Sequence, residues 1–317
     1  YLSLQSAEAP LAPMAGKADA APVTGVPRRI TKALISSAGR PTALDERSRP
    51  KSLIDIEGST LVAHVLRQLY RGGIQHVIFV VSHNGPLIVQ ELERCVRNLK
   101  GLHLEVIDLQ EDYAGFYAAS LLSAFERCFT DATEPGVLIS TADHIFDDGL
   151  VNDICAAPLS PGITDVCVLV DFSRDKWTGL PATTVGVKCS EDLERVCDLS
   201  RALGKPMVAG GLRQPQMGVE AGLFACTSQI FERLRVLAKS QEYYTITDAI
   251  QDLAHAGHVS SLATKGRNWL AIETTTELEE SRSSSVVKKM TSPESSPSQT
   301  LKDPLPAIFV AGGPMCT

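Results

Sequence analysis

The chain of 317 residues contains no apolar run long enough to cross a bilayer. Its longest runs, such as residues 77–81, fall far short of the ~20 residues that a membrane span requires. An excess of basic residues is also missing, because 30 Lys and Arg against 37 Asp and Glu give a formal charge of −7. This balance excludes a broad basic face for duplex DNA or RNA but leaves room for a small basic pocket. We therefore expect no membrane span in this chain and no nucleic-acid partner.

None of the eight cysteines is part of a CxxC pair. Several lie in apolar stretches, as Cys167 does in VCVLV, so buried thiols in a reducing cytosol are the simplest interpretation. The HxxH formed by His255 and His258 spans a predicted turn, which favours an exposed helix end over a zinc site. The sequence therefore predicts a cytoplasmic protein.

Both ends of the sequence have the composition of linkers. Residues 1–28 are rich in Ala and Pro, lack apolar periodicity and do not match a secretory signal, so we expect a disordered segment. The sequence starts with Tyr rather than Met, which leaves an upstream targeting segment open. Residues 291–317 begin as a Ser/Pro-rich linker and end on an apolar stretch at 307–317. That stretch is consistent with the first strand of a further, truncated segment.

Residues 29–290 are typical of one α/β domain. Apolar runs predict strands at 30–37, 76–82, 102–109 and 136–143. Amphipathic stretches predict helices between them, at 59–72, 87–98 and 116–128. This alternation predicts a parallel sheet with helices on both faces.

The second half of this domain changes character. Strands are expected at 164–172, 183–189, 196–199, 218–226, 258–264 and 268–273. Helices are expected at 228–239, 246–256 and 276–290. Because the strands are short and interrupted by polar residues, we expect extensions of the sheet in mixed orientation rather than a second independent core.

Ligands of parallel sheets bind at the carboxyl ends of the strands. Residues 36–40, 82–83 and 143–144 lie at such ends, so we expect them around one crevice. In ISSAGR, residues 35–40, the small side chains would let backbone N–H groups approach a phosphate or a base edge. The same composition is typical of a tight turn, and the segment matches neither a P-loop nor the dinucleotide fingerprint.

Three charged residues are candidates for phosphate or metal chemistry. Lys51 precedes an apolar segment and is either a phosphate ligand or a solvated surface charge. Asp143 ends a buried strand, where a carboxylate needs a partner or a metal, and oxygen ligands suit Mg²⁺; alternatively it caps the next turn. Glu273 ends another apolar strand and is either a second metal carboxylate or the start of a helix. Asp147 and Asp148 are expected at a helix start.

Together these segments resemble the GT-A-like nucleotidyltransferase superfamily, whose members couple a nucleoside triphosphate to a phosphorylated sugar or alcohol. The stretch PKSLIDIEGSTLVAHVLRQLYRGGIQHVIFVVSH is similar to that family's PK-L-I-G-L-H-L-L-GI-I-VV pattern. ADHIFDDGLV, GVEAGLFACT and WLAIETTTELEESR follow in the family's order, so the resemblance covers roughly residues 30–290. The DHIF stretch and the tail WLAIETTTELEE favour the branch of CTP:inositol-1-phosphate and other phospho-alcohol cytidylyltransferases.

The resemblance implies a three-layer, mostly parallel, Rossmann-like sheet of the nucleotide-diphospho-sugar transferase type, with mixed-sheet C-terminal extensions. It implies nucleotide-binding roles for Ser36, Ser37, Ala38, Gly39, Ser82, Tyr113, Gly115 and Ser120. Lys51 and Arg40 would stabilise the phosphates during transfer. Asp143 would bind Mg²⁺, and Glu273, where the family usually has aspartate, would complete the metal site. Gly222 would approach the acceptor substrate.

The sequence departs from the family in its first loop. Where the family reads AAGxGxR, this chain has SAG followed by Arg40 and Pro41, and the loop to Lys51 is about two residues short. Arg40 either replaces the missing arginine or nothing does, and Pro41 removes a backbone donor. Glu273 keeps the charge of aspartate but adds a methylene. These changes affect the expected catalytic rate more than the fold.

The leading prediction is thus a Mg²⁺-dependent enzyme that condenses an NTP, CTP in the first place, with a phosphorylated alcohol such as inositol phosphate. One alternative is a sugar-1-phosphate uridylyl- or guanylyltransferase. Another is a catalytically weakened, nucleotide-binding regulatory homologue, which the altered loop favours. The base, the acceptor and the oligomeric state are not determined by the sequence.

Overall fold

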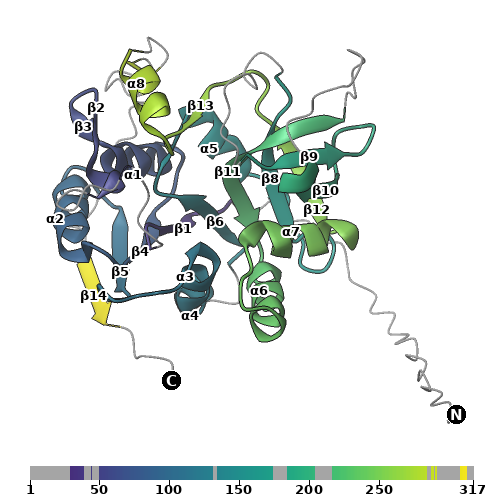
Figure 1. The fold of residues 1–317 in the computed structure, drawn as a ribbon, viewed down its shortest axis with the longest axis horizontal. Coiled ribbons are helices and arrows are strands. Elements are labelled where there is room, and N and C mark those ends of the chain that lie inside the picture. The colour runs from purple at the N-terminus through teal and green to yellow at the C-terminus, as the bar shows by residue number, and fades with distance from the viewer. Residues whose placement is uncertain are drawn as a thin grey trace, which may run out of the picture.

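The computed structural model describes residues 29–38, 44, 50–130, 134–173, 184–203, 216–283, 287, 288, 290 and 308–312. These residues form a ten-stranded mixed sheet covered by helices, together with two small two-stranded sheets (Figure 1). The predicted disorder of residues 1–28 and most of the predicted linker lie outside the described residues.

The first half of the domain supplies the parallel part of the sheet. Its strands are β1 (Lys32–Ser36), β4 (His76–Val81), β5 (His103–Asp108) and β6 (Val137–Thr141). They run parallel in the order β6-β1-β4-β5. The helices between them are α1 (Leu61–Arg71), α2 (Gly85–Val96), α3 (Tyr117–Ser123) and α4 (Phe125–Cys128). The β-α alternation predicted from the sequence is therefore confirmed.

Alternate residues of the central strands enter two separate cores. Leu34 and Ile78 pack on the face covered by α3, α6 (Gln229–Ser240) and α7 (Ile246–His255). Ile35 and Phe79 pack on the opposite face, which is covered by α1, α2 and α5 (Asp148–Cys155). Because successive side chains of a strand point to opposite faces, a strand buried on both sides is apolar at consecutive positions, as residues 33–35 and 77–81 are.

The second half adds strands in mixed orientation, as expected. They are β8 (Val166–Asp171), β9 (Gly186–Cys189), β10 (Val196–Ser200), β11 (Met217–Cys226) and β12 (Val259–Ala263). The long strand β11 is antiparallel to β6, β8 and β9 and so joins both halves. At the opposite edge, β14 (Ile308–Gly312) pairs in parallel with β5. The final apolar stretch thus contains a strand of this same sheet; whether a further segment begins there stays a prediction.

A third, smaller core lies near the carboxyl edge of the parallel strands. It joins the hairpin β2 (Asp55–Ile56) and β3 (Ser59–Thr60) to the pair β7 (His144–Phe146) and β13 (Trp269–Ala271). Ile56, Ile145 and Ile272 are fully buried in it. Helix α8 (Thr275–Ser283) packs on this core and is drawn next to β13 in Figure 1. The sequence did not predict β7.

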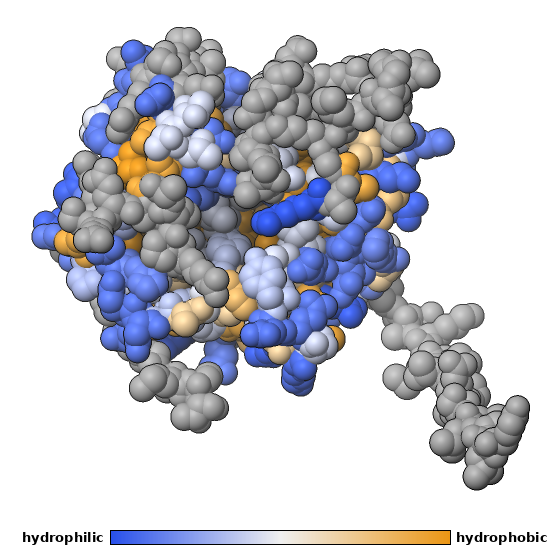
Figure 2. All heavy atoms as spheres, viewed as in Figure 1, coloured by the Kyte–Doolittle hydropathy of each residue, from blue (hydrophilic) through white to orange (hydrophobic). Residues whose placement is uncertain are grey.

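Hydrophilic side chains predominate on the face shown in Figure 2, where apolar side chains gather only in small patches. Among the described residues, no helix combines the length and the apolar character that a membrane crossing requires.

Candidate active site

The carboxyl ends of three parallel strands lie side by side at one edge of the sheet, with Ser36 and Ser37 among the residues there. Ser36 lies opposite Val80 on β4 and opposite Thr141 on β6. The N–H of Ser37 then donates to the carbonyl of Val80 over 2.9 Å, which continues the pairing beyond β1. The ends of β1, β4 and β6, which the expected segments follow, are therefore neighbours at this edge; a crevice between them stays a prediction.

The loop that follows β1 is held by hydroxyl groups. Ser36 Oγ lies 2.7 Å from Ser120 Oγ on α3 and accepts the N–H of Ala38 over 3.1 Å. Ser37 Oγ lies 2.9 Å from Ser52 Oγ, which ties the loop to the short 3₁₀ helix η1 (Lys51–Leu53). Small side chains are thus used here to keep the backbone close to η1 and α3. Gly39 and Arg40, which belong to the same prediction, lie outside the described residues.

Lys51 and Asp143 form an ion pair near this edge of the sheet. Lys51 Nζ lies 2.6 Å from Asp143 Oδ2, and their side chains are 16% and 15% exposed. Burial alone would raise the pKa of Asp143, but the charges of Lys51 and His144 and their hydrogen bonds hold it well below its usual range. The carboxylate is therefore held in its ionised form, paired with Lys51. The sequence predicted both residues for the site but not their contact.

His144 belongs to the candidate site through contacts that the sequence did not reveal. Its Nδ1 lies 2.7 Å from Asp143 Oδ1 and 2.7 Å from Thr141 Oγ1, and the Thr141 hydroxyl also bonds to Asp143. The imidazole lies parallel to the indole of Trp269, with an interplanar angle of 2° and centroids 6.2 Å apart. Burial lowers the pKa of His144, but the carboxylate of Asp143 outweighs it and the pKa is raised. His144 therefore fixes one oxygen of Asp143 while Lys51 takes the other.

The second predicted metal ligand, Glu273, is brought to the same place by the β7–β13 pair. Ala271 pairs with His144, and the N–H of Ile272 donates to the carbonyl of Asp143 over 3.0 Å. The negative charge of Glu273 contributes to the raised pKa of His144. Glu277, which was not predicted, accepts the N–H of Glu273 over 2.7 Å through Oε2 and so orients this turn.

Gly222 lies in an irregular part of β11, where its pairing with β8 shifts between Glu220 and Phe224. Its φ is +78°, and a Cβ at this position would lie 2.5 Å from His144 Nε2. Its N–H donates to the carboxylate of Glu220, whose pKa is raised, mainly by burial. Only a glycine allows β11 to approach the imidazole this closely. The structure therefore places Gly222 beside His144.

The remaining predicted residues line the ends of β4 and β5. Ser82 is buried, and its hydroxyl has no hydrogen-bond partner among the described residues. Tyr113 and Gly115 lie in the loop between β5 and α3 and contact each other, since a Cβ at Gly115 would overlap the Tyr113 hydroxyl. Burial raises the pKa of Tyr113 to about 12. Within the described structure no hydrogen bond or ion pair joins these three residues to Asp143, so their role stays a prediction.

The donor set suits a hard divalent cation. Among the described residues, no cluster of three or more His, Cys, Asp or Glu side chains has the arrangement of a metal site. Mg²⁺, however, usually binds through one or two carboxylates and completes its shell with water and substrate phosphates. Asp143 and Glu273 would be such a pair, and their role as metal ligands stays a prediction; a transition-metal site would need more nitrogen or sulfur ligands.

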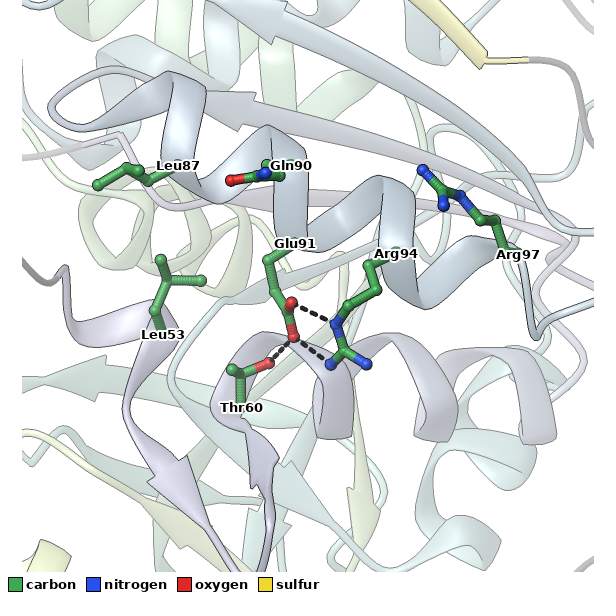
Figure 3. A pocket seen from close by; sticks show the side chains of 7 residues that line it. All are labelled: Leu53, Thr60, Leu87, Gln90, Glu91, Arg94 and Arg97. Carbon is green, nitrogen blue, oxygen red and sulfur yellow. Dashed lines mark hydrogen bonds and ion pairs between the residues drawn. The ribbon is translucent and has the colours of Figure 1, made fainter.

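A groove of about 460 Å³ lies elsewhere, between α2 and the start of α1 (Figure 3). Its lining residues are Leu53, Thr60, Leu87, Gln90, Glu91, Arg94 and Arg97. Glu91 is held there by Thr60 over 2.6 Å and by Arg94 over 2.7 Å. None of the predicted site residues lines this groove.

Comparison with known proteins adds independent information. A family model described as the MobA-like NTP transferase domain matches residues 33–210, which is more than half of the chain. A bifunctional IPC transferase and DIPP synthase from Rubrobacter xylanophilus is 26% identical over 251 residues, which cover 78% of this chain. The match covers 50% of that relative, so the chain spans about half its length.

Two solved structures share the fold. The inositol-1-phosphate CTP transferase from T. maritima has a TM-score of 0.59 at 16% identity, covering 86% of this chain and 99% of that one. A Bacillus anthracis protein described as a glucose-1-phosphate thymidylyltransferase in complex with sucrose has a TM-score of 0.58 at 14% identity, covering 80% and 94%. The α/β fold expected from the resemblance is therefore confirmed.

Proposed function

Because the chain belongs to the family of MobA-like NTP transferase domains, we propose that it transfers the cytidylyl group of CTP to a phosphorylated alcohol such as an inositol phosphate. The observation that carries this proposal is the pairing of Lys51 with Asp143 at 2.6 Å, beside the loop after β1. A cation for phosphate and a carboxylate for a metal are what nucleotidyl transfer needs at one point. The fold alone would not support the proposal, since one fold hosts many functions.

The reaction joins two anions. A phosphate oxygen of the acceptor attacks the α-phosphorus of CTP in line and forms a new P–O bond. The bond from the α-phosphorus to the bridging oxygen of the β-phosphate breaks, and pyrophosphate leaves with that electron pair. No covalent enzyme intermediate and no redox partner is required. The task of the protein is therefore to align the phosphates and to offset their repulsion.

Particular residues are suited to this task. The Lys51 ammonium would contact the phosphates, together with Arg40 as the sequence predicts. Asp143 and Glu273 would hold Mg²⁺, which when bound supplies additional positive charge at the phosphates. The loop at Ser37 and Ala38, together with Ser82, would contact the nucleotide. The N–H groups of Ser37 and Ala38 are themselves bonded to Val80 and Ser36, so they hold the shape of the loop. Hydrogen bonds from Thr141 and His144 would keep Asp143 in one orientation throughout the cycle.

The choice of CTP and of a polyol phosphate rests on two relatives. The Rubrobacter protein bears the name of an IPC transferase and the T. maritima structure that of an inositol-1-phosphate CTP transferase. An alternative, transfer to a sugar 1-phosphate from another nucleotide, is supported by the thymidylyltransferase-like neighbour. The shortened first loop supports a second alternative, a regulatory homologue that binds nucleotide without turnover. The seven described cysteines are free, which is compatible with a reducing, cytoplasmic setting.

A pyrophosphate-release assay with Mg²⁺ tests the proposal. CTP, UTP, GTP, TTP and ATP are crossed with inositol phosphate, amino-alcohol phosphates and sugar 1-phosphates. We expect release from CTP with inositol phosphate or a related polyol phosphate. Release from a different pair would replace the proposed substrates. If no pair of substrates releases pyrophosphate but CTP still raises the melting temperature, the regulatory homologue would be favoured.

A further inference from the structure

Asp143, the carboxylate proposed to bind the metal, is already paired with a cation, the ammonium of Lys51. Lys51 Nζ lies 2.6 Å from Asp143 Oδ2, on the oxygen that faces away from His144 and Thr141. We propose that Lys51 acts as a stand-in for the divalent ion, so that the chain binds its metal only together with a triphosphate. This inference rests on the proposed function, because it takes Asp143 as the metal ligand.

The hydrogen bonds of Asp143 show why the two cations compete. Oδ1 is taken by the Thr141 hydroxyl and by His144 Nδ1, which lies 2.7 Å away. Oδ2 is taken by Lys51. A divalent ion on Oδ2 would therefore lie next to the Lys51 ammonium, and the repulsion between the two positive charges makes them compete for this oxygen. Thr141 lies in β6 and His144 in β7 against Trp269, whereas Lys51 lies at the start of the three-residue helix η1. The flexible lysine side chain is the group that can leave at the lowest cost.

A triphosphate gives the ammonium a new partner. When phosphate oxygens approach the loop after β1, Lys51 can move from the carboxylate to the phosphates, which leaves Oδ2 open for the metal. The two binding events then favour each other, and by linkage each raises the affinity of the other by the same factor. With no triphosphate present, the ion must compete with an ammonium in direct contact with its own ligand.

The competition between Lys51 and the metal is strong because the Lys51–Asp143 pair is largely shielded from water. Exposed ion pairs contribute little, because water screens them. Both side chains are less than a fifth exposed here, and Glu273 adds further negative charge near His144. Losing the ammonium should therefore increase the attraction of the site for another cation by a measurable factor.

The test is Mn²⁺ binding without nucleotide, measured from the EPR signal of free Mn²⁺. Lys51→Met keeps an unbranched apolar stem and removes the charge, and we expect it to bind Mn²⁺ at least about tenfold more tightly than the wild type. Such a factor corresponds to about 1.4 kcal/mol. Lys51→Gln, whose amide can still donate to Asp143, is a second variant in case Lys51→Met folds poorly. Lys188→Met is the matched control, because Lys188 is exposed on β9 and its loss changes the net charge equally.

Three results would overturn the proposal. The first is that both Lys51 variants bind Mn²⁺ no more tightly than the wild type and Lys188→Met. The second is that wild-type protein binds Mn²⁺ alone as tightly as it does with a non-hydrolysable CTP analogue present. The third is that adding Asp143→Asn to Lys51→Met leaves the increased affinity unchanged. None of these measurements requires turnover, so they separate this proposal from failure of the proposed reaction.

Discussion

Gly222 offers a direct test of how the site is assembled. Replacing it by alanine puts a Cβ 2.5 Å from His144 Nε2 and 2.6 Å from its Cδ2, at a backbone φ of +78°. Gly58, in the turn of the β2–β3 hairpin, has the same φ of +78°, and a Cβ there would meet nothing within 4 Å. Gly58→Ala is therefore a matched control for the backbone part of the effect.

The expected magnitudes follow from these two environments. An alanine in the left-handed region costs about 1–2 kcal/mol, and this term is common to both variants. Gly222→Ala must also displace a buried ring that is stacked on Trp269, and overpacking of this kind costs about 1–3 kcal/mol more. We expect Gly222→Ala to lower the free energy of unfolding by that additional amount relative to Gly58→Ala.

Activity should separate the two variants as well. A displaced His144 loses its contact with Asp143 Oδ1, now 2.7 Å, and the carboxylate loses its fixed orientation. We expect kcat/KM for pyrophosphate release to fall at least about tenfold in Gly222→Ala, a loss of about 1.4 kcal/mol, and to stay near the wild-type value in Gly58→Ala. Urea unfolding and steady-state kinetics measure the two effects. Equal destabilisation by both variants, or full activity of Gly222→Ala, would refute the reasoning.

Two further predictions concern stability and the second carboxylate. Burial lowers the pKa of His76 from 6.5 to about 4. Between these two pH values the unfolded chain binds more protons than the folded chain, so the free energy of unfolding rises with pH. The rise amounts to about 3 kcal/mol at most. His76→Gln should remove this part of the pH dependence in urea unfolding; an unchanged slope between pH 4 and 6.5 would contradict it. Glu277→Ala leaves the N–H groups of Glu273 and Thr274 without their acceptor and should cost about 1–2 kcal/mol. Glu277→Ala should also raise the Mg²⁺ concentration needed for half-maximal activity. The control Glu279→Ala, at an exposed position, should change neither the stability nor this Mg²⁺ concentration. Equal effects of both variants would count against the role of Glu277.

The parallel half of the fold was predictable because its signals are local. A strand such as residues 76–81 is buried on both faces, so its sequence is one continuous apolar run. Lys51, Asp143 and Glu273 could be proposed as site residues because each lies in a stretch that resembles a family motif, and the structure brings the first two into contact. The position of Asp147 at a helix start is confirmed, since its side chain accepts the N–H of Gly149 over 3.0 Å.

The missed features depend on contacts between distant parts of the chain. Strand β7 has only three residues, and its partner β13 lies more than 120 residues downstream. The sequence of β7 is therefore too short to show the alternating pattern that predicts a strand. His144 acquires its role from Asp143, Trp269 and Gly222 together, which no spacing in the sequence reveals. Glu277 looks like any acid in the first turn of a helix until its backbone partners are known.

The most direct test of the account is pyrophosphate release from CTP and inositol phosphate by Asp143→Asn. Asp147→Asn is the matched control, because it makes the same substitution at a helix cap four residues away, where asparagine caps equally well. We predict that Asp143→Asn lowers kcat/KM at least about a hundredfold, as expected when a group that holds a catalytic metal is removed. Its circular dichroism spectrum should stay unchanged. Asp147→Asn should keep near wild-type activity. Full activity of Asp143→Asn would contradict the assignment of this edge of the sheet as the site of nucleotidyl transfer.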